Sequence, residues 1–167
     1  MKNLWAPWRM TYITGADEQA ASGKCVFCVS DDHVRPDKDR LILNVGKLSI
    51  IMMNRYPYTN GHLLVAPRRH VPELSDLTKE EMSDLLGHVR SSIEILRKDM
   101  NPDGFNVGLN LGRVAGAGVE EHIHFHIVPR WNGDTNFMTV FADVRVIPEH
   151  LEASFDRLVK YFKELPE

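Results

Sequence analysis

Residues 122–128 read His-Ile-His-Phe-His-Ile-Val, an alternation of histidines with apolar residues that is typical of a β-strand. Because successive side chains of a strand point to opposite faces, the spacing predicts His122, His124 and His126 on one face of a sheet. The apolar side chains between them are expected to pack against a helix on the other face. Imidazoles in such a row can bind Zn²⁺ or Fe²⁺, or one can act as a nucleophile. The spacing alone leaves both chemistries open.

The segments around the histidine strand predict an antiparallel sheet packed by helices. Short apolar runs bounded by turn residues predict further strands at 41–45, 48–53, 62–66 and 105–110. The apolar spacing of a helix occurs at 78–98 and 148–164. Thr78 and Glu81 form a capping box at the start of the first helix. The expected fold is α+β, with about five antiparallel strands, one main helix packed on one face and a C-terminal helix.

Length and charge narrow the classes of protein. The 167 residues, 43% hydrophobic and 26% charged, fit one domain, which we divide into an N-terminal arm (1–39), a core (40–130) and a C-terminal extension (131–167). A formal net charge of −3 argues against a general binder of nucleic acid or membrane surfaces, since both need a basic field. No apolar run approaches the roughly 18 residues of a membrane span, and the N-terminus lacks the apolar centre of a secretory signal. We therefore expect a cytoplasmic protein.

A glycine-bearing loop directly precedes the histidines. Residues 110–120 include Gly112, Gly116 and Gly118, and glycines allow backbone N–H groups to approach an anion closely. Such a loop is a weak signal by itself. Its place just before the histidine strand suggests that an imidazole meets a phosphorus centre.

The two cysteines, Cys25 and Cys28, have the C-x-x-C spacing. In an apparently intracellular chain this spacing suggests a metal or redox site more than a structural disulfide. A thioredoxin-like redox site would need a βαβ context that the sequence does not show. The pair by itself is half a zinc site, and two simply buried thiols remain the alternative.

Two motifs resemble those of the histidine triad (HIT) family. His122-Ile-His124-Phe-His126-Ile-Val matches the family's His-φ-His-φ-His-φ-φ signature, and the block from Asn54 to Pro67, with Gly61-His62, looks like its second strand block. Together they cover about residues 40–130. The ends, LWAPWRMTYI and PRWNGDTNFM, are similar to the bacterial branch related to diadenosine tetraphosphate phosphorylases.

The resemblance implies a role for each site residue. His124 is implied as the nucleophile that attacks an α-phosphate and forms a nucleotidyl-histidine, and His122 and His126 serve position and charge. Phosphate or nucleotide binding is implied for Asn54 (at the ribose), His62, Asn110, Gly116 and Gly118. Arg130 falls on the histidine face if the strand persists, where it could hold an incoming phosphate. Hydrolases of the family have Gln or Ser near Gly118 and Val119, so backbone groups replace them here or phosphate is bound differently.

The resemblance also implies a metal and a mode of assembly. Relatives use two cysteines and two histidines for zinc, which corresponds here to a structural Zn²⁺ site of Cys25, Cys28, His70 and His122. Such a site would pin the N-terminal segment beside the nucleophile. Relatives commonly form homodimers or higher homo-oligomers, which we expect here too.

The leading functional prediction is phosphorolysis of diadenosine tetraphosphate to ADP and ATP, with a small-molecule nucleotide as substrate. Inorganic phosphate is already an anion, so it needs positioning and charge neutralisation more than a general base. Three alternatives stay open: hydrolysis of dinucleoside polyphosphates or nucleoside phosphoramidates, a metalloenzyme with the three histidines as ligands, and a nucleotide sensor without turnover. Base preference and physiological substrate are not readable from the sequence.

Overall fold

The computed structural model of the protein describes residues 25–30, 35–134 and 149–165. One antiparallel sheet is formed by β1 (Ile42–Val45), β2 (Ser49–Met53), β3 (Leu63–Pro67), β4 (Gly104–Leu109) and β5 (Phe125–Arg130), in the order β1-β2-β3-β5-β4. The helices are α2 (Lys79–Met100) and α4 (Leu151–Phe162), with short 3₁₀ turns at η1 (Leu74–Asp76) and η2 (Arg113–Ala115). Residues 1–24 of the expected arm and 135–148 of the expected extension lie outside the described residues.

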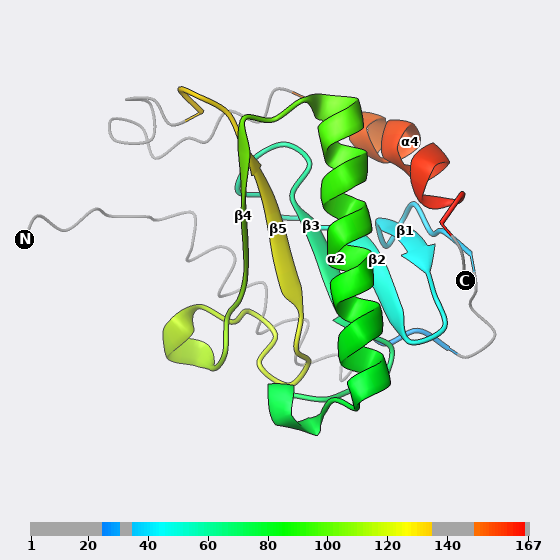
Figure 1. Cartoon of the computed structure of the whole chain (residues 1–167), viewed down its shortest axis with the longest axis vertical. Helices are drawn as coiled ribbons and strands as arrows, with labels where there is room; N and C mark the ends of the chain where they lie inside the picture. Colours follow the sequence, from blue (N-terminus) through cyan, green and yellow to red (C-terminus); the bar gives the residue numbers. More distant parts are fainter. Residues whose placement is uncertain (1–24, 31–34, 135–148, 166–167) are drawn as a thin grey trace, which may run out of the picture.

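Both helices cover the same face of the sheet. In Figure 1, α2 lies in front of the sheet and runs roughly along its strands, and α4 lies beside β1. Apolar side chains of the two helices and of alternate strand positions form one core between these layers: Leu41, Leu43, Ile51, Met53, Leu63, Val65, Leu85, Val89, Leu96, Ile127, Phe155, Leu158 and Phe162. The predicted capping box is confirmed, since Glu81 N–H donates to Thr78 Oγ1 and Thr78 N–H donates to the Glu81 carboxylate. The expected α+β fold with a main and a C-terminal helix is confirmed.

The predicted strands at 41–45 and 48–53 are joined by a tight turn at Gly46-Lys47. Gly46 N–H donates to the Ser49 carbonyl at 2.9 Å, which closes the turn between β1 and β2. A Cβ at Gly46 would lie 2.9 Å from Cε1 of His88, so the turn packs closely against α2 only because this residue has no side chain.

The opposite face of the sheet bears a second apolar cluster and the histidine site. The cluster consists of Phe27, Ile42, Ile50, Met52, Leu64 and Ala66. Leu64 pairs with His126 across β3 and β5, so His126 points to this second face while Ile127 points into the helix-side core. The site therefore lies on the face that the helices leave uncovered.

The strand predicted at 122–128 is shifted, because β5 begins at Phe125 and runs to Arg130. His122 and His124 precede it, and the Ile123 N–H donates to the Val71 carbonyl at 2.8 Å, outside the sheet ladder. Within β5, the side chains of Phe125 and Ile127 pack against the helices as predicted. His122 and His124 precede the strand, so the alternation of strand faces does not determine where their side chains point.

His88, on α2, is buried. Its Nδ1 lies 2.6 Å from Ser49 Oγ and 3.2 Å from the Asp84 carboxylate, so these partners satisfy this ring nitrogen. Separately, none of the helices in the described ranges has both the length and the apolar character that a membrane crossing requires.

Candidate active site and metal centre

The imidazole of His124 is held in one tautomer. Its Nδ1–H donates to the carbonyl of His122 at 2.8 Å, so the lone pair of a neutral ring lies on Nε2. Burial lowers the pKa of His124, and the bond to the carbonyl opposes this shift. His124 is thus a buried, neutral imidazole with a nucleophilic Nε2.

A hydrogen-bonded chain fixes the tautomer of the neighbouring His126. The Tyr58 N–H donates to Nδ1 of His62 at 3.1 Å, and the Asn54 amide lies 3.3 Å from the same atom. The remaining ring proton of a neutral His62 is therefore on Nε2, which donates to Nδ1 of His126 at 3.0 Å. It follows that the proton of His126 is on its own Nε2.

Nε2 of His126 is buried and has no hydrogen-bond partner among the described residues. Burial, and secondarily His124, lower the pKa of His126 to about 4, so this ring is also neutral near pH 7. The rings of His124 and His126 lie 4.9 Å apart, centroid to centroid. A nucleophilic lone pair and an uncommitted N–H donor therefore sit on adjacent imidazoles, an arrangement that suits a phosphate group.

Of the other implied binding residues, His62 contacts His126, and the rest form hydrogen bonds or turns in the neighbouring loops. Both ring nitrogens of His62 form hydrogen bonds, one with the Tyr58 N–H and one with His126, so His62 supports His126. The side-chain amide oxygen (Oδ1) of Asn54 accepts from the Tyr56 N–H at 2.9 Å, next to His62. Asn110 donates to the carbonyl of Gly116 at 3.4 Å and so closes the loop before the histidines. In that loop Gly112 and Gly116 have φ of 77° and 93°, which favour glycine, whereas Gly118 is not at positive φ.

Arg130 is engaged elsewhere. At the end of β5 its guanidinium forms two hydrogen bonds to the Asp134 carboxylate, at 2.5 and 2.8 Å, and a third to the Asn106 side chain at 2.8 Å. The structure does not bring Arg130 into a contact with the histidines, and its charge is already balanced by Asp134.

Four residues from distant parts of the chain meet in a second cluster. Cys25, Cys28, His70 and His122 each offer one donor atom, and these atoms lie within 4.8 Å of one another. Sγ of Cys25 lies 3.3 Å from Nδ1 of His122, and Sγ of Cys28 lies 3.3 Å from Nδ1 of His70. His122 donates its Nε2–H to the Pro67 carbonyl at 2.8 Å, so its Nδ1 lone pair faces the sulfurs.

The chemistry of this donor set fits a zinc ion. Burial lowers the pKa of His122 to about 4, which keeps the imidazole neutral and able to ligate. Burial and the neighbouring Cys25 raise the pKa of Cys28 to about 11, so the thiol of Cys28 resists ionisation until a cation compensates its charge. Two sulfurs and two imidazole nitrogens form the closed tetrahedral set of structural zinc sites.

Sequence reasoning missed three residues at the site. Phe27, between the two cysteines, stacks on His124 with centroids 4.6 Å apart. Arg40 donates to the carbonyls of Val26 and Cys28 and so holds the cysteine loop. Tyr58 packs on the ring of His62 at 4.6 Å. The sequence could have indicated two of them, since Phe27 lies inside the C-x-x-C motif and Tyr58 lies close to Gly61-His62. Nothing in the sequence indicates that Arg40 binds the cysteine loop.

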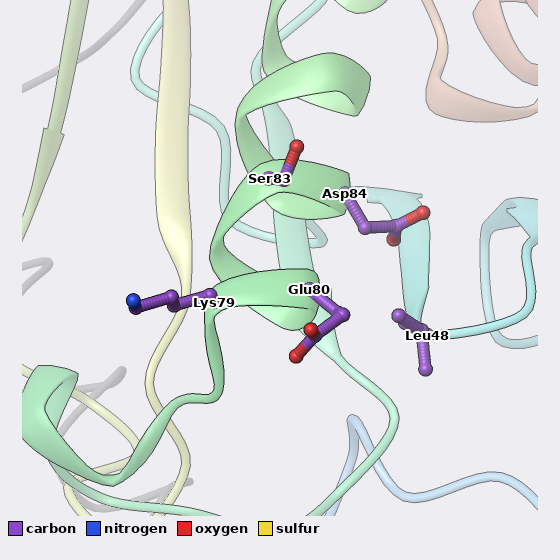
Figure 2. A pocket seen from close by; sticks show the side chains of 5 residues that line it. All are labelled: Leu48, Lys79, Glu80, Ser83 and Asp84. Carbon is purple, nitrogen blue, oxygen red and sulfur yellow. The ribbon is translucent and has the colours of Figure 1, made fainter.

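A hollow on the surface lies apart from these histidines. It is lined by Leu48, Lys79, Glu80, Ser83 and Asp84, at the first turns of α2 (Figure 2). None of these residues belongs to the histidine pair or to the metal cluster, so the hollow takes no part in the candidate site.

Comparisons with known proteins agree with this geometry. The model of the HIT domain matches residues 35–133. The chain is 40% identical over 154 residues to AP-4-A phosphorylase of Mycobacterium tuberculosis, covering 90% of this chain and 79% of that protein. It is 40% identical over 120 residues to bis(5'-adenosyl)-triphosphatase of Dictyostelium discoideum, covering 71% and 78%. A zinc-bound histidine triad family protein from Mycobacterium smegmatis superposes with a TM-score of 0.60 at 26% identity, over 74% of this chain and 84% of that one.

Proposed function

Because the chain belongs to the HIT domain family, we propose that it is an enzyme that transfers a nucleotidyl group from a diadenosine polyphosphate through a covalent bond to His124. The observation that carries the proposal is the pairing of two tautomers. Nε2 of His124 bears a lone pair, and Nε2 of the adjacent His126 bears an uncommitted proton. The names of the two 40%-identical relatives, a phosphorylase and a triphosphatase, support the substrate class.

In the first step, Nε2 of His124 forms a bond to the α-phosphorus of the substrate. The bond from that phosphorus to the bridging oxygen breaks, and the electron pair leaves with the nucleoside polyphosphate, ATP when the substrate is diadenosine tetraphosphate. The leaving group is a stable anion, so little general acid catalysis is needed. Nδ1–H of His124 stays on the His122 carbonyl, which stabilises the charge gained by the ring. The Nε2–H of His126 is free to donate to a phosphate oxygen as negative charge develops.

In the second step, an oxygen of inorganic phosphate attacks the AMP-histidine, the P–N bond breaks, and His124 is regenerated. Diadenosine tetraphosphate and phosphate thus give ADP and ATP. Two observations support phosphate over water as the acceptor. Water, unlike phosphate, would need a general base. The acidic residues next to the histidines, Glu120 and Glu121, are exposed, and Glu120 lies 3.9 Å from Arg113, so neither is an evident base for water. The relative matched over 90% of this chain is named a phosphorylase.

Arg130 was predicted to hold the incoming phosphate, and its ion pair with Asp134 does not support that role unless the pair opens. Hydrolysis is the second candidate, favoured by the name of the Dictyostelium relative. A metal held by the three histidines together is disfavoured, because His122 directs Nδ1 at the cysteines and Nε2 at Pro67.

We also infer that Cys25, Cys28, His70 and His122 bind one structural Zn²⁺ per chain. The closed four-donor set supports this inference, as does the zinc-bound relative from M. smegmatis. Bound there, zinc would link the cysteine loop to the end of β3 and to the start of the histidine segment. Assembly into homo-oligomers and a cytoplasmic location stay predictions.

The test incubates the purified protein with diadenosine tetraphosphate and ¹⁸O-labelled phosphate and identifies the products by mass spectrometry. Labelled ADP together with ATP, formed only when phosphate is present, is the expected result. AMP and ATP formed at an undiminished rate without phosphate would make the enzyme a hydrolase. The His124→Ala variant is the control for a contaminating activity, since it should give no product.

A further inference from the structure

Phe27 has a place at the site that the chemistry described above does not explain. It stands between the two sulfur donors, Cys25 and Cys28, and is 1% exposed. Its ring stacks on the imidazole of His124, with centroids 4.6 Å apart and planes at 30°, and meets the ring of His122 at 5.2 Å and 52°. A side chain of the metal-binding loop thus lies directly on the nucleophile.

The known hydrogen bond does not by itself fix the plane of the nucleophile. The bond from His124 to the His122 carbonyl holds Nδ1, but the ring can still tilt about that atom and move Nε2. An aromatic ring packed on one face blocks this tilt, since offset-stacked rings have a preferred separation and angle. A nucleophile must meet phosphorus along a narrow line, and small displacements of the attacking atom cost rate. The contact with Phe27 supplies the missing constraint.

Phe27 is itself held from several sides. One nitrogen of Arg40 donates to the carbonyls of Val26 and Cys28, at 2.9 and 2.8 Å, on either side of the phenylalanine. The ring packs into the apolar cluster on the second face of the sheet, with Ile42 and Leu64 among its members. Because its ring is held by both the sheet and the cysteine loop, Phe27 can fix the imidazole of His124 relative to these two parts of the structure.

We propose that Phe27 is a positioning residue that holds the imidazole plane of His124 toward the substrate phosphorus. The proposal rests on the nucleotidyl-transfer function proposed above. It predicts that the flat ring at position 27, and not merely its apolar volume, sets the rate of the step in which His124 acts.

The test compares Phe27→Leu and Phe27→Met, which keep apolar volume without a flat face, with Phe27→Tyr, which keeps the face. Phe155→Leu is the matched control, because Phe155 is 4% exposed in the helix-side core. For each variant we would measure kcat and KM for diadenosine tetraphosphate, the single-turnover rate of AMP-histidine formation, zinc content and melting temperature. The ¹⁵N chemical shifts of His124 report its ring tautomer independently of turnover.

The Leu and Met variants are expected to lose about 10- to 100-fold in kcat and in the single-turnover rate, with KM nearly unchanged and zinc retained. Their His124 signals should remain those of the Nδ1–H tautomer, because the bond to the His122 carbonyl is kept, and should broaden as the ring tilts between orientations. Phe27→Tyr should retain most of the rate even where its melting temperature falls. Phe155→Leu should lower only the melting temperature. If Phe27→Leu does not fold, the rates of Phe27→Met and Phe27→Tyr still show whether the flat ring is needed.

Equal rates for Phe27→Leu, Phe27→Met and Phe155→Leu at equal zinc content would overturn the proposal and make Phe27 an ordinary core residue. So would a Tyr variant as slow as the Leu or Met variant. Failure of the proposed function looks different, because the wild type would then form no AMP-histidine. In that case the ¹⁵N signals still decide, and unchanged His124 signals in the Phe27 variants would overturn the positioning role.

Discussion

Replacing His62 with leucine should slow the chemical step without weakening nucleotide binding. The substitution breaks the chain that runs from the Tyr58 N–H through His62 to Nδ1 of His126. Without the donor at Nδ1, His126 is free to move its proton from Nε2 to Nδ1. The N–H that faces the developing charge on phosphate is then lost for a large share of the molecules.

The magnitude follows from the bond that disappears. A hydrogen bond to a charged group contributes about 1.5–3 kcal/mol, and each 1.36 kcal/mol in a barrier is a tenfold change in rate. His62→Leu should therefore lower kcat by up to about 10- to 150-fold, the full loss corresponding to a complete shift of the His126 proton to Nδ1. It should also destabilise the fold by about 1–3 kcal/mol, because the Tyr58 N–H loses the Nδ1 acceptor. His62→Gln retains an acceptor and a donor, so it should recover part of the rate.

The assay is single-turnover formation of AMP-histidine at saturating diadenosine tetraphosphate, with the melting temperature measured in parallel. His88→Leu is the control, since His88 is also buried and hydrogen-bonded but lies among Ser49 and Asp84 on the helix side. It should lose stability and keep its rate. A His62→Leu enzyme with unchanged kcat and a raised KM would refute the relay and make His62 a direct contact of the ground-state substrate.

Three further predictions concern the metal and pH. Purified protein should contain one zinc per chain by elemental analysis, and Cys25→Ser with Cys28→Ser should remove the metal and lower the melting temperature; unchanged metal and melting temperature would contradict the site. Burial lowers the pKa of His124, so the acid limb of kcat/KM should lie below the ordinary histidine value of 6.5, and a limb at 6.5 would contradict it. His126, with its pKa lowered to about 4, takes up a second ring proton and becomes charged between pH 6.5 and 4 only in the unfolded chain. Its contribution to stability is therefore fully present above pH 6.5 and is lost as pH falls toward 4, which thermal melts would show.

The strands and helices could be predicted because their side chains follow simple periods. The capping box of Thr78 and Glu81 even gave the first turn of α2 correctly. The predicted strand wrongly included His122 and His124. The alternation of polar and apolar residues indicates which way side chains point, but it does not show whether the backbone forms hydrogen bonds with a neighbouring strand. Nothing near Ile123 in the sequence indicates that its N–H binds the Val71 carbonyl. That bond comes from a loop about fifty residues away.

The candidate site shows the same division. A C-x-x-C pair and a histidine row are visible locally, and the resemblance joined them to His70, but only the fold brings their donor atoms within 4.8 Å. The stacking of Phe27 on His124 is likewise a consequence of tertiary packing. Arg130 and Asp134 are only four residues apart, but an extended strand would keep their side chains apart, and it is the turn after β5 that brings them together.

The most direct test of the account is the covalent intermediate. The protein is mixed briefly with diadenosine tetraphosphate in the absence of phosphate, quenched, digested and mapped by mass spectrometry under conditions that preserve the acid-labile P–N bond. The account predicts AMP on Nε2 of His124, no adduct in His124→Ala, and a kcat for that variant below a few per cent of wild type. An adduct on another residue, or a His124→Ala enzyme that still turns over at a substantial rate, would contradict it.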